Sequence, residues 1–337
     1  MPETERSGRS VLRAALTAVA LLAAAELAAR GLQPRLPSAT EGGFARNPHY
    51  ARGWPEYTRP DAERAPRDVP LVIAISNSQG FLRERSDAAE AWPSRLAAEL
   101  AALGAPARVL NWSMPGGNGA EMTLLAARAH AHDPDLVLLV SYNDNFGDRW
   151  RRLPLSYGYS DAHHLAYLPE VRAHLPLDLL VATSSYDPLG WLGAHSSLLW
   201  LRNRWGDVGE RWSWSVIEPA HRARSRAAGT ATVKEGGRFT LLGDFLRAAG
   251  AEESDGPALM VVGMPLCKEV FRNREVAGAF VIAAEERLAS RPRSRVLNAT
   301  ALVPDEEFYG ARHLRPAGHA RFAAWLAPEV RALLAED

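Results

Sequence analysis

The chain contains almost no cysteine and no excess of charge of either sign. Cys267 is the only cysteine among 337 residues, so the chain can form neither an intrachain disulfide nor a zinc site built from several cysteines. Lys and Arg together number 39 and so do Asp and Glu, and the resulting net charge of zero argues against a nucleic-acid partner. Hydrophobic residues make up 47% and charged residues 23%, as in ordinary globular proteins. This composition excludes collagen, a coiled coil, a disulfide scaffold and wholesale disorder.

The N-terminus lacks a long charge-free run but has the other marks of an export signal. Three arginines in the first 13 residues precede an apolar run at residues 14–25, an order typical of a signal peptide or an uncleaved signal anchor. The wider segment 11–32 reaches the roughly 20 residues that a membrane span needs, whereas small residues near 23–25 offer a cleavage site. We predict that residues 1–32 form a single-pass anchor in the inner or cytoplasmic membrane, with a cleaved signal peptide or a buried helix as alternatives. The rest of the chain is then expected outside the cytoplasm, in the periplasm or at the cell surface.

A proline-rich segment separates this region from the remainder. Residues 33–68 contain six prolines and the pair Gly42-Gly43, which interrupt helices. We predict a tether here and a folded domain over residues 69–337.

From residue 69 onward, short apolar runs alternate with helical patterns. Apolar runs, several of them rich in β-branched residues, predict strands at residues 70–75, 109–110, 135–140, 258–263 and 295–297. Helices are predicted over residues 86–103, where Gly104 ends the helix, and over residues 119–131. A further helical stretch follows the strand at 258–263 and runs to about residue 290, and a last amphipathic helix contains Phe322 to Leu333. This alternation predicts an α/β three-layer sandwich with a mostly parallel, flavodoxin-like five-stranded sheet.

Polar segments follow three predicted strands, where such sheets bind their ligands. They cover residues 76–80, 111–119 and 141–144, and a fourth polar segment at 308–319 precedes the last helix. Acyl transfer needs a nucleophile, a base and hydrogen-bond donors for the developing oxyanion. Ser78 offers a hydroxyl and His313 can accept its proton, while the Gly116 N–H and the Asn143 amide can act as donors.

At these residues the chain resembles the SGNH/GDSL hydrolase superfamily. Ser-Tyr-Asn-Asp at residues 141–144 is similar to the Gly-x-Asn-Asp block of that family, and residues 308–319 are similar to its C-terminal block. The resemblance implies that Ser78 is the nucleophile and His313 the base. It also implies an oxyanion hole from the Ser78 N–H, the Gly116 N–H and the Asn143 side chain, without a cofactor.

The chain departs from the family pattern at two acidic positions. Asn77 replaces the Asp of Gly-Asp-Ser, and it keeps the hydrogen-bonding shape of Asp but not its charge. Gly310 occupies the place of the Asp that normally orients the catalytic His, a role whose loss costs about 10⁴ in the serine-protease template. The neighbouring acids are Asp305, Glu306 and Glu307. We predict that one of these three, first of all Asp305, partners His313 in an active protein, with a backbone carbonyl as the alternative.

Residues 147–255 form a stretch that the predicted sheet does not require. Six tryptophans lie in it: Trp150, Trp191, Trp200, Trp205, Trp212 and Trp214. Residues 197–205 predict a basic amphipathic helix. Long insertions after a catalytic strand often build lids, and exposed indoles stack on sugars or lie at membrane interfaces. The alternative is that the tryptophans fill a small core beneath the insertion.

Three functions are compatible with these features. The first is an esterase that removes acyl, most simply acetyl, groups from an envelope carbohydrate or lipid, and the second is an O-acyltransferase that uses the same serine. Both follow the resemblance to anchored SGNH-type proteins that add or remove acetyl groups on polysaccharides. The third is a catalytically silent module that binds glycan or scaffolds the envelope polysaccharide machinery. Asn77 and Gly310 favour the silent module, whereas Ser78, Asn143 and His313 together favour an enzyme.

Two groups of histidines superficially suggest metal sites. They are His130, His132 and Asp133, and the pair His163-His164. Neither has a convincing third and fourth ligand nearby in the sequence, so no metal is predicted.

Overall fold

The computed structural model describes residues 3–32, 68–80, 90–113, 117–130, 132–147, 165, 168–175, 238–271 and 277–336. Several sequence predictions lie outside the described residues. They concern the tether up to residue 67, the helix start at 86–87, Gly116, the pair His163-His164, and the tryptophans and helix of the insertion.

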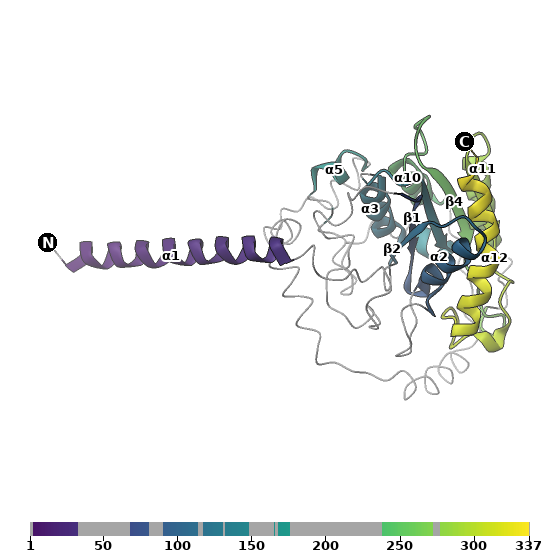
Figure 1. Cartoon of the computed structure of the whole chain (residues 1–337), viewed down its shortest axis with the longest axis horizontal. Coiled ribbons are helices and arrows are strands. Elements are labelled where there is room, and N and C mark those ends of the chain that lie inside the picture. Colours follow the sequence, from purple (N-terminus) through teal and green to yellow (C-terminus); the bar gives the residue numbers. More distant parts are fainter. Residues whose placement is uncertain are drawn as a thin grey trace.

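A single parallel sheet of five strands lies at the centre of the described domain (Figure 1). The strands are β1 (Leu71–Ser76), β2 (Arg108–Asn111), β3 (Leu136–Ser141), β4 (Ala258–Gly263) and β5 (Ser294–Asn298). Their spatial order is β2-β1-β3-β4-β5, and all neighbouring strands are parallel. The predicted α/β class and the five predicted strands are confirmed.

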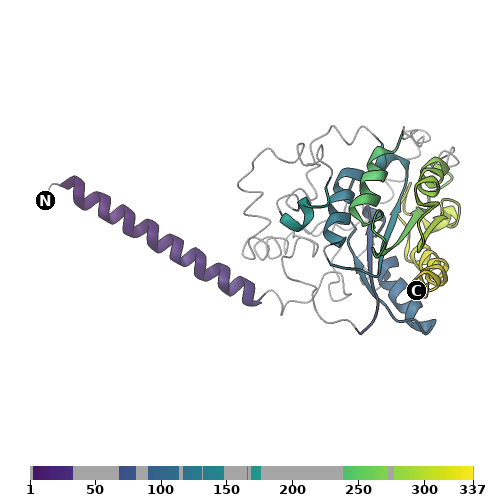
Figure 2. The same ribbon diagram turned by 90° about the horizontal axis from the view of Figure 1, so that it is seen from above.

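Helices cover both faces of this sheet. One face carries α3 (Gly119–His130), α10 (Thr240–Ala248) and α11 (Gly278–Leu288), and the other carries α2 (Trp92–Ala102) and α12 (Pro316–Leu334). The blue α2 and the yellow α12 lie side by side in both views (Figure 2). The architecture is a three-layer sandwich.

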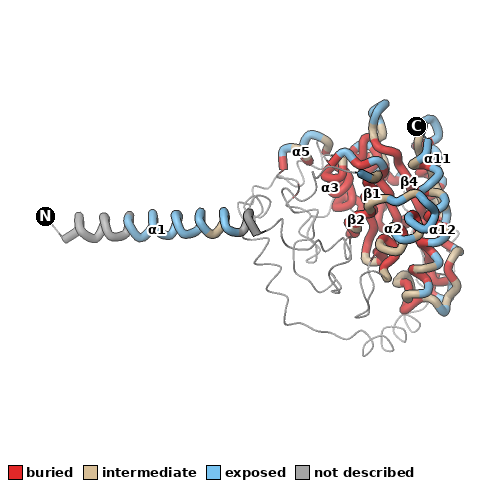
Figure 3. Tube along the Cα trace, viewed as in Figure 1, coloured by how far each residue is buried: buried red, intermediate tan, exposed pale blue. Residues whose placement is uncertain are grey.

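Alternate side chains of each central strand enter two different cores. Ile73 and Ile75 of β1 pack with α3, α10 and α11, whereas Val72 and Ala74 pack with α2 and α12. All residues of β1, β3 and β4 are therefore buried, as the interior of Figure 3 shows. Strands buried on both faces are continuous apolar runs in the sequence, which is why they were predictable.

Local sequence fixes one end of each of two helices of the sandwich. Asn118 Oδ1 accepts hydrogen bonds from the N–H groups of Ala120 (2.9 Å) and Glu121 (3.2 Å), and Glu121 Oε2 accepts from the Asn118 N–H (3.1 Å). This reciprocal capping box starts α3. Gly104 ends α2, as predicted, because it adopts a φ of +73° that suits glycine.

The range predicted as an insertion contains one helix of the core. α10 packs against α3 through Leu242 and Phe245 and connects β3 to β4 across the sheet face. Parallel neighbours need such a crossover helix. The C-terminal end of the range 147–255 therefore belongs to the sandwich itself.

The N-terminal segment forms helix α1 (Glu3–Leu32). The apolar side chains of its residues 13–28 are largely exposed, with Leu22 at 63% and Leu27 at 69%, and the helix stands apart from the sheet in Figure 1. Among the described helices, none combines the length and the hydropathy that a membrane crossing requires. The predicted membrane anchor is therefore not confirmed.

Candidate active site

Ser78 lies directly beyond the carboxyl end of β1, at the start of the helical turn η3 (Ser78–Gly80). The preceding Asn77 holds this turn, because its Oδ1 accepts a hydrogen bond from the Gln79 N–H (2.9 Å). The Asn77 Nδ2 lies 3.6 Å from the sulfur of Met264, just beyond β4. Asn77 thus performs the hydrogen-bonding task expected at this position without a charge. As the first residue of the turn, Ser78 has an N–H that the turn itself does not use.

His313 meets Ser78 from the other end of the domain sequence. Its Nε2 lies 2.8 Å from Ser78 Oγ, within hydrogen-bond distance. The loop that carries His313 is closed on itself by the Tyr309 N–H, which donates to the His313 carbonyl (2.8 Å). The loop is also attached to the segment after β4, because the Cys267 N–H donates to the Ala311 carbonyl (3.1 Å). The distance is that expected between a nucleophile and its general base.

Gln79 is a positioning residue that the sequence did not reveal. Its side chain is completely buried, and its Nε2 donates to the carbonyls of Pro265 (2.7 Å) and Arg312 (2.5 Å). The residue after the serine is thereby tied to the residue before His313. Gln79 lies next to Ser78 in the sequence, but only the fold shows where its amide points.

The β1 turn is also tied to the end of β2. Asn111 Nδ2 donates to the Gly80 carbonyl (2.9 Å). A Cβ atom at Gly80 would lie 1.8 Å from Ser113 Oγ, so only glycine fits between the two segments.

Asn143 opens the short helix α4 (Asn143–Phe146) directly after β3. Its side chain is completely buried, and its Oδ1 accepts a hydrogen bond from the Phe280 N–H of α11 (3.2 Å). This bond fixes which atom of the amide is oxygen and which is nitrogen. Ser78 and Asn143 both follow the ends of adjacent strands, β1 and β3, as predicted from the parallel sheet. Gly116 lies outside the described residues, so the oxyanion hole as a whole stays a prediction.

Asp305 has a different task from the one predicted. Its two carboxylate oxygens accept hydrogen bonds from the N–H groups of Lys268 (2.6 Å) and Glu269 (3.1 Å), in the turn after β4. Of the two other acids, Glu307 pairs with Arg321 (2.7 Å) and Glu306 is exposed. We therefore do not assign Asp305 to His313; its carboxylate holds the turn after β4.

The single cysteine is not a competing nucleophile. Burial, together with the negative charge of Asp305, raises the pKa of Cys267 to about 11. The thiol is therefore protonated at neutral pH and is a poor nucleophile.

His319, in the same sequence block as His313, has a structural role. Its ring is completely buried in the core between α2 and α12, and its Nδ1 accepts a hydrogen bond from the Trp92 N–H (3.1 Å). Burial and then the charge of Arg95 lower its pKa to about 3, so the ring is neutral.

Comparisons with known proteins give weak similarities only. No protein-family model matches the chain, and a search of curated proteins gave no match. Among solved structures, the chain is similar to "Crystal Structure of TesA" with a TM-score of 0.38 and 12% identity, covering 78% of this chain and 99% of that chain. It is also similar to a family two carbohydrate esterase from Clostridium thermocellum in complex with cellohexaose, with a TM-score of 0.33 and 12% identity, covering 80% of this chain and 66% of that chain. TM-scores this low define neither a common fold nor a common activity.

Proposed function

We propose that the protein is a serine esterase or O-acyltransferase with Ser78 as nucleophile and His313 as general base. The observation that carries the proposal is the 2.8 Å separation of Ser78 Oγ and His313 Nε2 at the carboxyl edge of the sheet. Residues separated by 235 positions meet there as the chemistry requires.

The proposed reaction has two acyl-transfer steps. His313 accepts the hydroxyl proton while Ser78 Oγ attacks the ester carbonyl, and the Ser78 N–H and the Asn143 amide donate to the oxyanion that forms. Collapse of this intermediate expels the alcohol, which takes the proton back from His313 and leaves an acyl-serine. A second hydroxyl compound then attacks the acyl-serine by the same route. If it is water the protein is an esterase, and if it is an acceptor hydroxyl the protein is a transferase.

The substrate class is proposed from the resemblance and the N-terminal sequence. An acyl ester, most simply an acetyl ester, of an envelope carbohydrate or lipid fits an SGNH-like site on a chain with an export-type N-terminus. This location is tested by a C-terminal reporter that is active only outside the cytoplasm. Reporter activity in the cytoplasm contradicts it.

The nucleophile is tested by labelling with a serine-directed fluorophosphonate and by turnover of p-nitrophenyl acetate. We expect the label on Ser78, and we expect Ser78→Ala to abolish labelling and to lower turnover at least ~10³-fold. Ser76→Ala is the matched control, because Ser76 is a buried serine of the same segment whose Oγ hydrogen-bonds, among the described residues, to the Asn77 carbonyl (3.4 Å). Equal turnover by Ser78→Ala and the parent protein contradicts the assignment.

A catalytically silent module is the second candidate. It is favoured by the engagement of Asp305 with backbone N–H groups and by Gly310 in the place of the family's Asp. An unlabelled, inactive parent that gains turnover on Gly310→Asp identifies the silent module. An active parent that is indifferent to Asp305→Asn identifies an enzyme that does not use this carboxylate.

A further inference from the structure

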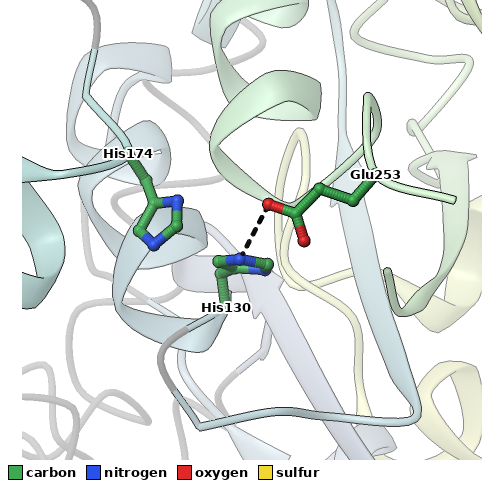
Figure 4. A group of neighbouring side chains, drawn as sticks. All are labelled: His130, His174 and Glu253. Atoms are coloured by element: carbon green, nitrogen blue, oxygen red, sulfur yellow. Dashed lines mark ion pairs between the residues drawn. The ribbon is translucent and has the colours of Figure 1, made fainter. Parts of the chain in front are cut away.

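Three side chains from distant parts of the sequence meet at the edge of the sheet where the strands begin. His130 is the last residue of α3, His174 lies in the turn after α5 (Pro169–Arg172), and Glu253 lies in the loop after α10. α3 and α10 end shortly before β3 and β4 start, so this edge lies opposite the edge that carries Ser78. Figure 4 shows the two imidazoles and the carboxylate facing one another.

The potential ligand atoms of the three side chains are close to the spacing of a metal site. One nitrogen of each imidazole and one carboxylate oxygen all lie within 4.8 Å of one another. His130 Nε2 and Glu253 Oε1 are 3.1 Å apart. A tetrahedral zinc ion with bonds of about 2.1 Å holds its ligand atoms ~3.4 Å apart. The widest separation therefore has to close by up to about 1.4 Å (4.8 − 3.4) for the three atoms to hold one ion.

The two imidazole rings pack edge to face. Their centroids are 4.2 Å apart at an interplanar angle of 74°. Neutral imidazole is the form that binds metal ions.

Two neighbouring residues make room for the group. Gly250 adopts a φ of +84°, and a Cβ there would lie 3.0 Å from His130 Nδ1, so glycine allows the ring its position. The nearby cation Arg291 is directed to the backbone, where it donates to the carbonyls of Ala251, Glu253 (3.2 Å) and Pro257 (2.9 Å). Its guanidinium thus donates to the loop backbone, while the Glu253 carboxylate pairs with His130.

We propose that His130, His174 and Glu253 bind one zinc ion. Two imidazole nitrogens and one carboxylate oxygen are ligands that Zn²⁺ prefers, and a water molecule supplies the fourth position. The sequence predicted no metal beside His130, because the other two ligands come from positions 44 and 123 residues away (174 − 130 and 253 − 130).

An ion at this site acts independently of the proposed esterase activity. α3 has 12 residues, so about 18 Å of helix separates His130 from the end of α3 near the site. An ion at His130 therefore cannot touch a substrate at Ser78. It instead links the turn after α5, which lies within the range 147–255, to the ends of the core helices α3 and α10.

The test uses tag-free, full-length protein from which metal has been removed with a chelator. Zn²⁺ titrated by calorimetry is expected to bind with one ion per chain and to raise Tm, because a ligand of the folded state stabilises it. Co²⁺ in the same site is expected to give the visible absorption of a tetrahedral complex. Both His174→Ala and Glu253→Gln are expected to weaken Zn²⁺ affinity at least ~100-fold. Loss of a direct ligand should weaken binding more than loss of a residue that only supports a ligand, which costs about 10–100-fold.

Glu252→Gln is the matched control, because Glu252 is the adjacent carboxylate and binds Arg247 (3.0 Å) instead. It is expected to bind Zn²⁺ like the parent. Glu253 lies half exposed in a loop, so Glu253→Gln decides the question if His174→Ala does not fold. The proposal is overturned if the parent binds no Zn²⁺, or if Zn²⁺ binding survives unchanged in Glu253→Gln. Turnover of an ester plays no part in these readouts, so failure here leaves the proposed activity untouched.

Discussion

The buried ring of His319 is expected to make the protein less stable in mild acid. His319 lies in the α2–α12 core with no exposed surface, and its Nδ1 accepts the Trp92 N–H. Burial, followed by the charge of Arg95, lowers its pKa from 6.5 to about 3, against a smaller opposing effect of the Leu314 carbonyl. The folded state therefore holds this ring neutral over a pH range in which the unfolded chain protonates it.

The sign and size of the effect follow from the linkage between proton binding and folding. Above a pH of 6.5 neither state binds a proton at this ring, so it adds no pH dependence. Below that pH the unfolded state gains a proton, and the free energy of unfolding falls by about 1.4 kcal/mol for each pH unit until the folded pKa is reached. At about pH 5 the loss amounts to ~2 kcal/mol.

The measurement compares the parent with His319→Asn. Asparagine places its Oδ1 near the position of the histidine Nδ1, so it keeps an acceptor for the Trp92 N–H and removes the titration. Urea unfolding at about pH 8 and about pH 5 gives the free energy of unfolding of both proteins. The pH-dependent loss is expected to be ~2 kcal/mol smaller in His319→Asn.

Other titrating groups are common to both proteins and cancel in this difference. An equal loss in the two proteins refutes the conclusion that the folded core excludes the protonated ring. His319→Asn loses some packing at both pH values, and this loss also cancels.

Three further changes test the site and its supports. Asn143→Ala is expected to lower kcat by about 10²–10³, as for loss of one oxyanion donor. A fall in kcat at unchanged KM indicates a lost donor, whereas a change in both indicates that loss of the hydrogen bond from the Phe280 N–H has altered the site. Gln79→Met keeps the length of the side chain but removes both donors to neighbouring carbonyls; it is expected to slow fluorophosphonate labelling by up to about 10², while KM for a small ester stays unchanged. Gly80→Ala is expected to lower stability by about 1–3 kcal/mol by overpacking against Ser113, and Ser113→Gly is expected to restore part of the lost Tm.

The parts of the fold that depend on periodicity were predictable from the sequence. β1 and β3 are buried on both faces, so their apolar runs are continuous and their limits were predicted to within one residue. The same logic placed Ser78 and Asn143 together, since the ends of parallel neighbours meet at one edge. The start of α3 carried a recognisable signal as well, because Asn118 and Glu121 have the spacing of a capping box.

The direction in which side chains point was not predictable. Asp305 lies eight positions before His313 (313 − 305), which made it a plausible partner. Its carboxylate instead turns to N–H groups of Lys268 and Glu269, which the fold brings in from 37 and 36 residues away. α10 was not predicted for a different reason. Its apolar residues follow a long tryptophan-rich stretch, and the whole range was interpreted as one insertion.

α3 connects the two proposed sites. Its first turn is capped by Asn118 beside the strand ends of the proposed active site, and the Asn145 side chain after β3 donates to the Gly117 carbonyl just before it (2.9 Å). Its last residue, His130, is a proposed zinc ligand. Because one rigid helix spans both edges, zinc binding should stabilise the framework of the site without changing the 2.8 Å contact of Ser78 with His313. Zinc removal should accordingly lower Tm while the kcat of folded protein stays the same. If zinc removal lowers kcat at a temperature well below Tm, the two edges of the sheet are instead coupled through α3.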